Sequence, residues 1–389
     1  MKFSRIIATL LCLALVLAFA SCGKPSSGGD TGEVTNKTPG QVTKAPGGDT
    51  EPDETDEETF EPIPEPEDVD LSVTEWTSAN GPDGYEIRKN NNGSPVSLGN
   101  GSYSFDKSIV VVPGAGEADS SAVEIVYELT DTYFAFTTIA GVDDSSVNGT
   151  VEFLVYADDT LAARTGAMAH GEFMYLQAEV FGCSEVKLVV TNADGDNEGD
   201  IAVWAAPTLF AGMDFTKYEA TLPGKDVDYY IDELNWKSVA CLHADTKGSP
   251  FINKNEGGGL LSMGNGFFVA EKGVWLHPFL GDEATTYAEI VIDLTSAKVS
   301  KFVGVFGLSD EYVATANGYG GVVDVTRRSV RVAFLVDGTE VESHDFVNSV
   351  KLGTTVIDLS LASEFTIRLY NYDGTHTCDA TVVSGGFVS

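Results

Sequence analysis

Alternating acidic residues in one loop are the first candidates for chemistry in this 389-residue chain. Carboxylate oxygens at alternate positions, with glycine for the bend, are ligands that suit Ca²⁺. The loop supplies them at Asp194, Asp196, Glu198 and Asp200. An EF-hand is excluded, because strand-like runs flank the loop and Ala205 stands in the place of the closing glutamate. Asp143 and Asp144 form a second candidate pair. The pattern predicts a structural calcium site, with a solvated acidic hairpin as the alternative.

A second group of residues has the chemistry of a sugar site. Such a site needs an aromatic face for the C–H side of the ring and planar polar groups for the hydroxyls. The first half of the chain offers Tyr85, Glu86 and Arg88 close together, with a solvated turn as the alternative. The second half offers a more scattered set of Asn255, Glu256, Trp275 and His277. The remaining tryptophans lie inside strand patterns and are expected in the core, namely Trp76, Trp204 and Trp236.

Motifs of catalysis do not occur in the sequence. The five histidines are scattered, none in HExxH spacing, and there is no GxSxG, P-loop or CxxC pair. Paired carboxylates cleave glycosides in other proteins, but a chain with 59 acidic residues contains many accidental pairs. A binding protein is therefore expected, and an enzyme is not.

Short β-strands must position these residues. Runs rich in β-branched and aromatic residues are separated by turns of Gly, Asn and Asp, and no sustained 3.6-residue apolar period appears. The predicted strands include 123–129, 151–156, 186–191, 289–294, 330–336 and 365–370. This pattern predicts an all-β protein built from β-sandwich (jelly-roll) domains.

The folded region contains an internal sequence repeat with two copies. Residues 124–130 recur as 289–295, Phe153–Tyr156 as Phe334–Asp337, and 184–190 as 363–369, in the same order. The tail Asn192–Gly195 recurs as Asn371–Gly374. Two copies of one module without a catalytic segment favour a binding protein that gains from valency.

The N-terminus reads as a targeting segment followed by a tether. Lys2 and Arg5 precede an apolar run that ends in small residues before Cys22, a pattern that resembles the lipobox of bacterial lipoproteins. We expect a signal peptide over 1–21, lipidation at Cys22 and a disordered acidic linker over 22–68. The two jelly rolls are then 69–210 and 228–389, joined by a linker over 211–227.

The net charge and the number of cysteines limit which partners and which disulfides are expected. The net charge of −36 excludes nucleic acid and anionic lipid as attractive partners and is compatible with neutral glycans, cationic surfaces or calcium. Once the signal and Cys22 are set aside, three cysteines remain, so at most one disulfide forms within the chain. Cys241 and Cys378 are the candidate pair, with buried thiols as the alternative.

Both copies resemble the NPCBM family, the novel putative carbohydrate-binding module. The landmarks are an opening segment at Leu71–Ser78, Gly141–Asp144, a closing segment at Asp200–Ala206 and, in the second copy, Lys272–Pro278. The resemblance implies a jelly roll that binds carbohydrate, with galactose-type glycans among the expected ligands. In the closing segment Ile201 stands where the family has His, and Val203 and Ala206 stand where it has Asp. Val112 stands where the second copy keeps His277.

The sequence therefore predicts a lipid-anchored protein on the extracellular face of a bacterial membrane. Its two modules bind glycans together for avidity. The alternative is a structural or protein-interaction role in which the modules kept the fold and lost the sugar, and the changed closing segments favour that alternative.

Overall fold

The computed structural model describes residues 67–389 except 131, 213–221, 224–225, 242–249, 256–257, 265, 279–286, 311–327, 348–350 and 372–379. These described residues belong to one compact unit, residues 63–389. The predicted signal peptide, Cys22 and nearly all of the acidic linker lie outside them, as do Glu256 and Cys378. No helix among the described residues has the length and apolar character needed to cross a membrane.

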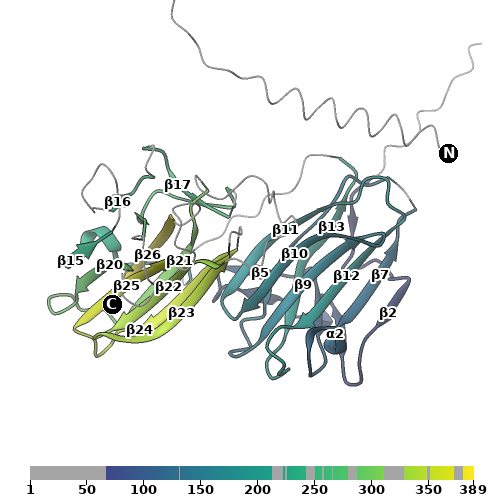
Figure 1. Ribbon diagram of the computed structural model, residues 1–389, viewed down its shortest axis with the longest axis horizontal. Helices are drawn as coiled ribbons and strands as arrows, with labels where there is room; N and C mark the ends of the chain where they lie inside the picture. Colours follow the sequence, from purple (N-terminus) through teal and green to yellow (C-terminus); the bar gives the residue numbers. More distant parts are fainter. Residues whose placement is uncertain are drawn as a thin grey trace, which may run out of the picture. The chain divides into compact units, whose positions relative to one another are not determined.

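Module one, residues 69–210, is a β-sandwich (Figure 1). One sheet has the order β10-β9-β12-β7-β2, and the other has the order β11-β8-β13-β6-β3 with β1 paired to β13. A short hairpin, β4-β5, stands apart. The elements are β1 (Val69–Asp70), β2 (Ser78–Asn80), β3 (Glu86–Lys89), η1 (Asn90–Gly93), β4 (Val96–Leu98), β5 (Tyr103–Phe105), β6 (Ser108–Val112), α2 (Ala118–Ser121), β7 (Val123–Glu128), β8 (Ala135–Val142), β9 (Thr150–Ala157), β10 (Thr160–Ala169), β11 (Glu172–Glu179), β12 (Glu185–Asn192) and β13 (Ala202–Phe210).

Module two repeats this topology strand for strand. Its sheets have the orders β23-β22-β25-β20-β15 and β24-β21-β26-β19-β16, with β14 on β26 and a hairpin β17-β18. The elements are β14 (Tyr229–Tyr230), η2 (Ile231–Glu233), β15 (Trp236–Ala240), β16 (Phe251–Ile252), β17 (Leu261–Met263), β18 (Phe268–Ala270), β19 (Val274–Leu276), β20 (Tyr287–Asp293), β21 (Lys301–Leu308), β22 (Arg328–Val336), β23 (Thr339–Val347), β24 (Leu352–Asp358), β25 (Glu364–Asn371) and β26 (Thr381–Val388). The all-β fold and the duplication are thus confirmed.

The internal repeat needs one correction of register. Asp158 accepts hydrogen bonds from the backbone N–H and hydroxyl of Ser184, and Asp337 accepts the same pair from Ser363. When these two aspartates are aligned, Val155 of module one is equivalent to Phe334 of module two. The predicted match of Phe153 with Phe334 is therefore two residues out of register. A shift of two keeps every side chain on the same face of a strand, so the apolar pattern could not reveal it.

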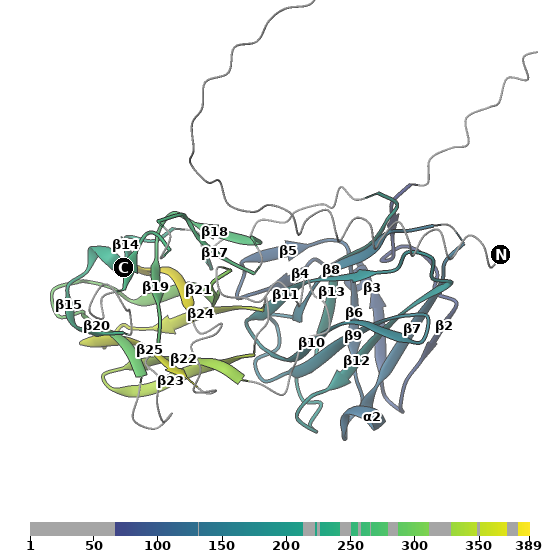
Figure 2. The ribbon, with the colours of Figure 1, turned by 45° about the horizontal axis from the view of Figure 1, so that its top comes forward.

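The two modules share one sheet. β11 of module one pairs antiparallel with β24 of module two, with Phe173 opposite Leu352, and this pairing creates a 12-stranded sheet (Figure 2). An apolar cluster with members from both modules covers the junction, and in it Tyr175 stacks on Phe267 with ring centroids 5.1 Å apart. The repeat pattern did not predict this pairing, because it concerns how two copies meet and not how either one folds.

The shared sheet is buried on both faces. In β13, Trp204 packs into the core of module one, while the alternate residues Val203 and Ala205 pack into the junction cluster. In β19, Val274 and Leu276 face the core of module two, and Trp275 faces the junction cluster. A strand between two apolar layers shows a continuous apolar run instead of alternation, as both segments do.

Candidate functional site

An open pocket of about 640 Å³ lies at the edge of module one, where β2 and β3 begin. Its walls are two half-buried aromatic side chains and a few small or apolar residues. The lining residues are Trp76, Thr77, Ser78, Ala79, Tyr85 and Ile87. Half-buried rings of this kind keep one face against the core and offer another to a ligand.

Local sequence fixes both aromatic rings. Tyr85 lies against the backbone of Gly81, where an added Cβ would come within 2.7 Å of the tyrosine Cγ. Trp76 packs on the core of module one, and the ammonium of Lys89 lies 4.4 Å from its ring centroid. This cation–π contact holds the lysine stem beside the indole. Trp76 was expected in the core, so sequence reasoning missed it as a member of the site.

The predicted group Tyr85, Glu86 and Arg88 is divided by strand geometry. Successive side chains of a strand point to opposite faces. Tyr85 and Ile87 pack against the core of module one and line the pocket. Arg88 is paired with Val110, which belongs to the junction cluster, so the guanidinium lies on the other face of the sheet with Glu86. Only Tyr85 of the three faces the pocket.

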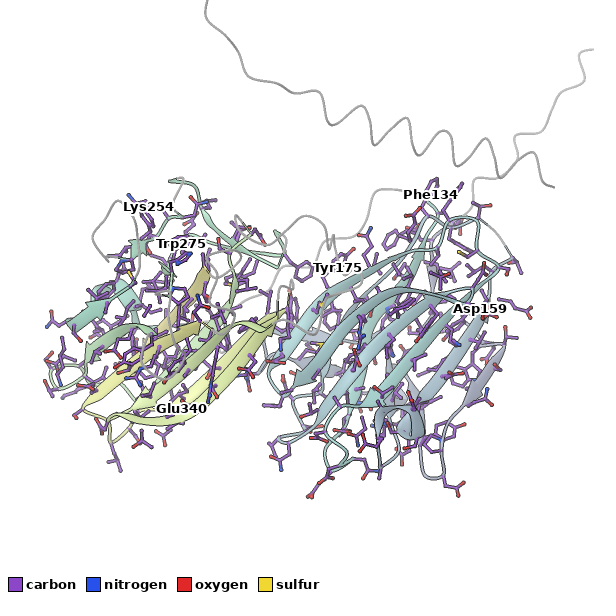
Figure 3. All side chains as sticks on the ribbon, viewed as in Figure 1. Phe134, Asp159, Tyr175, Lys254, Trp275 and Glu340 are labelled. Carbon is purple, nitrogen blue, oxygen red and sulfur yellow. The ribbon has the colours of Figure 1, made fainter. Side chains whose placement is uncertain are left out.

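The predicted site of module two is not assembled among the described residues. Trp275 is 1% exposed and belongs to the junction cluster (Figure 3). A covered indole has no free face for a sugar, so its prediction as a ligand-stacking residue is corrected. His277 is buried beside it, with Nδ1 3.0 Å from the carbonyl oxygen of Pro278. Asn255 closes a turn by accepting the N–H of Gly259 at 2.6 Å, and Glu256 lies outside the described residues.

The acidic loop of module one uses two of its four carboxylates to order its own backbone. Asp194 accepts the N–H of Asp196, and Asp196 accepts that of Glu198. Asp200 differs, because it is buried and one oxygen accepts the N–H of Thr150 at 2.8 Å, while Oδ2 has no hydrogen-bond partner among the described residues. Burial, together with the charges of Asp194 and Asp196, raises the pKa of the Asp200 carboxyl to about 6, against the opposing effect of the hydrogen bond from Thr150.

The second acidic pair is a structural clamp. Asp144 accepts the hydroxyl of Ser97 and the backbone N–H groups of Asn100 and Gly101, at 2.6 to 2.8 Å. Asp143 accepts the N–H of Ser145 at 3.0 Å. No group of three or more His, Cys, Asp or Glu side chains that could hold a metal ion occurs within the described part of the chain. The calcium site remains a prediction.

Cysteine pairing is not decided by the described residues, because Cys378 lies outside them. Cys241 is buried in the core of module two, and burial raises the pKa of its thiol to about 12. A thiol with so high a pKa is unreactive at neutral pH.

Comparison with known proteins gives one family match, which lies in module one. Residues 67–210 match the model of the NPCBM/NEW2 domain. No curated protein sequence matches the chain.

Three solved structures illustrate the similarity. The M60 catalytic domain of Clostridium perfringens ZmpB with its CBM51-1 and CBM51-2 domains is 16% identical, over 82% of this chain and 39% of that one (TM-score 0.31). The CBM51 of Clostridium perfringens GH95, in complex with methyl-galactose, is 28% identical, over 36% of this chain and 99% of that one (TM-score 0.31). The tandem CBM51 modules of the family 98 glycoside hydrolase of Streptococcus pneumoniae are 16% identical, over 83% of this chain and 99% of that one (TM-score 0.32). The chain thus spans about two fifths of the first of these proteins. The fold assignment rests on the strand pairing described above and not on these scores.

Proposed function

We propose that the chain is a carbohydrate-binding protein whose module one takes a galactose-type glycan in the pocket between Trp76 and Tyr85. The supporting observation is that two half-buried rings flank an open pocket in the part of the chain that matches the NPCBM/NEW2 model. The ring faces suit the C–H side of a galactose ring, and the hydroxyls of Thr77 and Ser78 suit its oxygens.

Module two supplies a counterpart to one half of this pocket. Trp236 opens β15, which pairs with β20 as β2 pairs with β7, and it packs half-buried on the core of module two. Its indole N–H donates to the carbonyl of Ile231 at 2.9 Å, which fixes the ring. We include Trp236 as the second contact point, and two linked sites raise avidity for a multivalent surface.

The rival function is a structural or protein-interaction role. The burial of Trp275 and His277 favours it for the predicted site of module two, since neither side chain can reach a ligand in this structure. The aromatic pocket of module one favours sugar binding there.

A glycan array probed with the full chain, in calcium and again in EDTA, tests the proposal. We expect galactose-terminated glycans to bind and Trp76→Ala or Tyr85→Ala to weaken that binding about tenfold or more, because a stacked ring contributes on the order of 1–2 kcal/mol. Leu361→Ala is a matched control, since Leu361 is 97% exposed and does not line the pocket. An array that stays blank with folded protein would count against sugar binding and for the rival role.

The lipid anchor is part of the same proposal. Mass spectrometry of the mature protein should find a diacylated Cys22 as the first residue, and Cys22→Ser should release the protein from the membrane fraction. An unmodified N-terminus elsewhere in the chain would contradict the proposed location on the outer face of the membrane.

A further inference from the structure

A polar groove of about 1000 Å³ lies where the two modules meet. Module one contributes residues of β9 and β10 and of the loops after β8 and β12, and module two contributes residues of β23 and β24. The groove is separate from the Trp76–Tyr85 pocket, with which it shares no lining residue.

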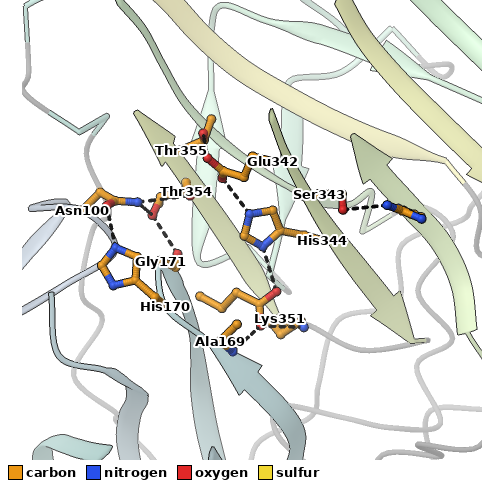
Figure 4. A network of polar contacts seen from close by, with 12 residues as sticks. Asn100, Ala169, His170, Gly171, Glu342, Ser343, His344, Lys351, Thr354 and Thr355 are labelled. Atoms are coloured by element: carbon orange, nitrogen blue, oxygen red, sulfur yellow. Dashed lines mark hydrogen bonds and ion pairs between the residues drawn. The ribbon is translucent and has the colours of Figure 1, made fainter. Parts of the chain in front are cut away.

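A buried ionic network fixes one side of the groove (Figure 4). Glu172 of module one accepts from the Lys351 ammonium at 2.8 Å and lies 3.0 Å from Nδ1 of His344, both in module two. Nε2 of His344 lies 2.7 Å from Glu342, which in turn accepts the hydroxyl of Thr355. Because Glu172, His344 and Glu342 are each held by two or more partners, this side of the groove is preorganised.

Other polar groups line the groove with bonding capacity to spare. Arg164 donates through Nε to Glu152 at 2.7 Å, and its Nη1 makes no hydrogen bond with the described residues. The Nε2 atom of His170 lies 3.1 Å from the side-chain oxygen of Asn100, while its Nδ1 is a buried atom with no hydrogen-bond partner in the described part of the chain. Two exposed apolar side chains, Val147 and Val356, complete the lining.

We propose that this groove binds a neutral oligosaccharide that contacts both modules at once. Its volume is at the upper end for small-molecule sites and holds several sugar rings. Preorganised amide, guanidinium, imidazole and carboxylate groups match vicinal hydroxyls, and the two valines suit the apolar faces of the rings. The inference rests on the proposed function, since it names a longer glycan and a second place on the chain for it.

The charge of the lining excludes acidic glycans. Acidic side chains outnumber the cationic ones around the groove, and a sialylated or sulfated chain would be repelled. The acids are Glu117, Glu152, Glu172, Asp194, Glu342 and Asp345, against Arg164, Lys351 and His344.

Calorimetric titration of the full chain tests this site. The probes are methyl-galactose, a neutral galactose-terminated tetrasaccharide and the sialylated form of that tetrasaccharide. Ala167→Trp fills the groove from an exposed position on β10 without removing a polar contact. Leu361→Trp adds the same indole at an exposed position that lines neither site. His170→Ala removes the unpartnered ring nitrogen without filling the groove.

We expect Ala167→Trp to raise the Kd for the neutral tetrasaccharide at least tenfold and to leave methyl-galactose binding unchanged. His170→Ala should weaken the tetrasaccharide severalfold, Leu361→Trp should match the wild type, and the sialylated probe should bind more weakly than the neutral one. Tetrasaccharide binding that is equal in Ala167→Trp and Leu361→Trp would overturn the groove site alone. A wild type that binds none of the probes would overturn the proposed function together with it.

Discussion

Glu172 and Lys351 occupy equivalent positions in the two modules and meet across their junction as an ion pair, with Oε2 and Nζ 2.8 Å apart. The sequence offset between them equals the offset between Phe173 and Leu352, which lie directly opposite each other in the shared sheet. The junction is therefore pseudo-two-fold symmetric, and strand β11 pairs with its own counterpart. The acid in one copy and the base in the other make the symmetric contact electrostatically complementary.

Breaking this pair should destabilise the whole unit. Both side chains are less than 10% exposed, and removing one partner of a buried pair costs about 3–5 kcal/mol, because the other charge stays buried. Glu172→Gln should therefore lower the free energy of unfolding by about 3 kcal/mol in urea denaturation. The double variant Glu172→Gln with Lys351→Met should cost less than the sum of the two single changes, and strict additivity would contradict a direct coupling.

His344 should make stability fall at alkaline pH. Hydrogen bonds and charge from Glu172 and Glu342 outweigh burial and raise its pKa from 6.5 to about 9. The folded state then holds a proton that the unfolded chain releases, so this stabilisation is complete below pH 6.5 and disappears as the pH rises through about 9. Melting temperatures of the wild type should fall between these pH values, and His344→Gln should flatten that slope. Parallel slopes would show that another group is responsible.

Glu172 should determine how the free energy of unfolding changes at acidic pH. Lys351 and His344 overcome desolvation and lower its pKa from 4.5 to about 2. Its contribution is therefore present above about pH 4.5 and is lost as the pH falls toward 2. Glu172→Gln should lose less stability than the wild type over that interval, as measured by urea unfolding at each pH. An unchanged acid limb would mean that the Glu172 carboxyl titrates normally.

Gly81→Ala should weaken sugar binding without touching the sugar. The new methyl group would come within 2.7 Å of the Tyr85 ring, which must move from its place in the pocket. We expect a severalfold rise in the Kd for galactose-terminated glycans with little change in melting temperature. Gly212→Ala is the matched control, because none of the described residues lies within 4 Å of the added atom there. Equal binding by the two variants would separate Tyr85 from the site.

Asp200→Asn tests the calcium prediction. Because burial raises the pKa of Asp200 to about 6, its charge at pH 7 costs stability, and without calcium the variant should be more stable by on the order of 1 kcal/mol. If calcium binds the unpartnered Oδ2, added calcium should raise the melting temperature of the wild type and not that of the variant. No calcium effect on either protein would leave Asp200 as a buried acid in a structural loop.

Much of the fold followed from local patterns. Strand positions, the all-β class and the duplication could be read from apolar runs and from the turns of Gly, Asn and Asp between them, because these signals are local in the sequence. The burial of Trp275 could not be read. Its exposure depends on whether the outer face of its sheet meets water or another apolar layer, and the partner layer comes from hairpins and from the other copy.

The candidate site shows the same division. Tyr85 was singled out for its type, whereas Trp76 was assigned to the core because it sits in a strand-like run. The pocket needs both residues, which meet only after β2 and β3 pack on opposite sheets. Glu86 and Arg88 were grouped with Tyr85 by proximity in sequence, which strand alternation overrides.

The shared strand pairing also bears on what a shortened chain would do. A protein ending at Gly212 would leave Glu172 and Phe173, the two residues of β11 that pair with β24, without their partner strand, and an open strand edge invites pairing with another copy. In such a homodimer Lys351 would be replaced by a second Glu172, so two carboxylates would meet in place of an ion pair. Repulsion between these like charges would then oppose self-association of the single module. In the duplicated chain, the ion pair favours pairing of its own two modules over pairing with a neighbouring chain.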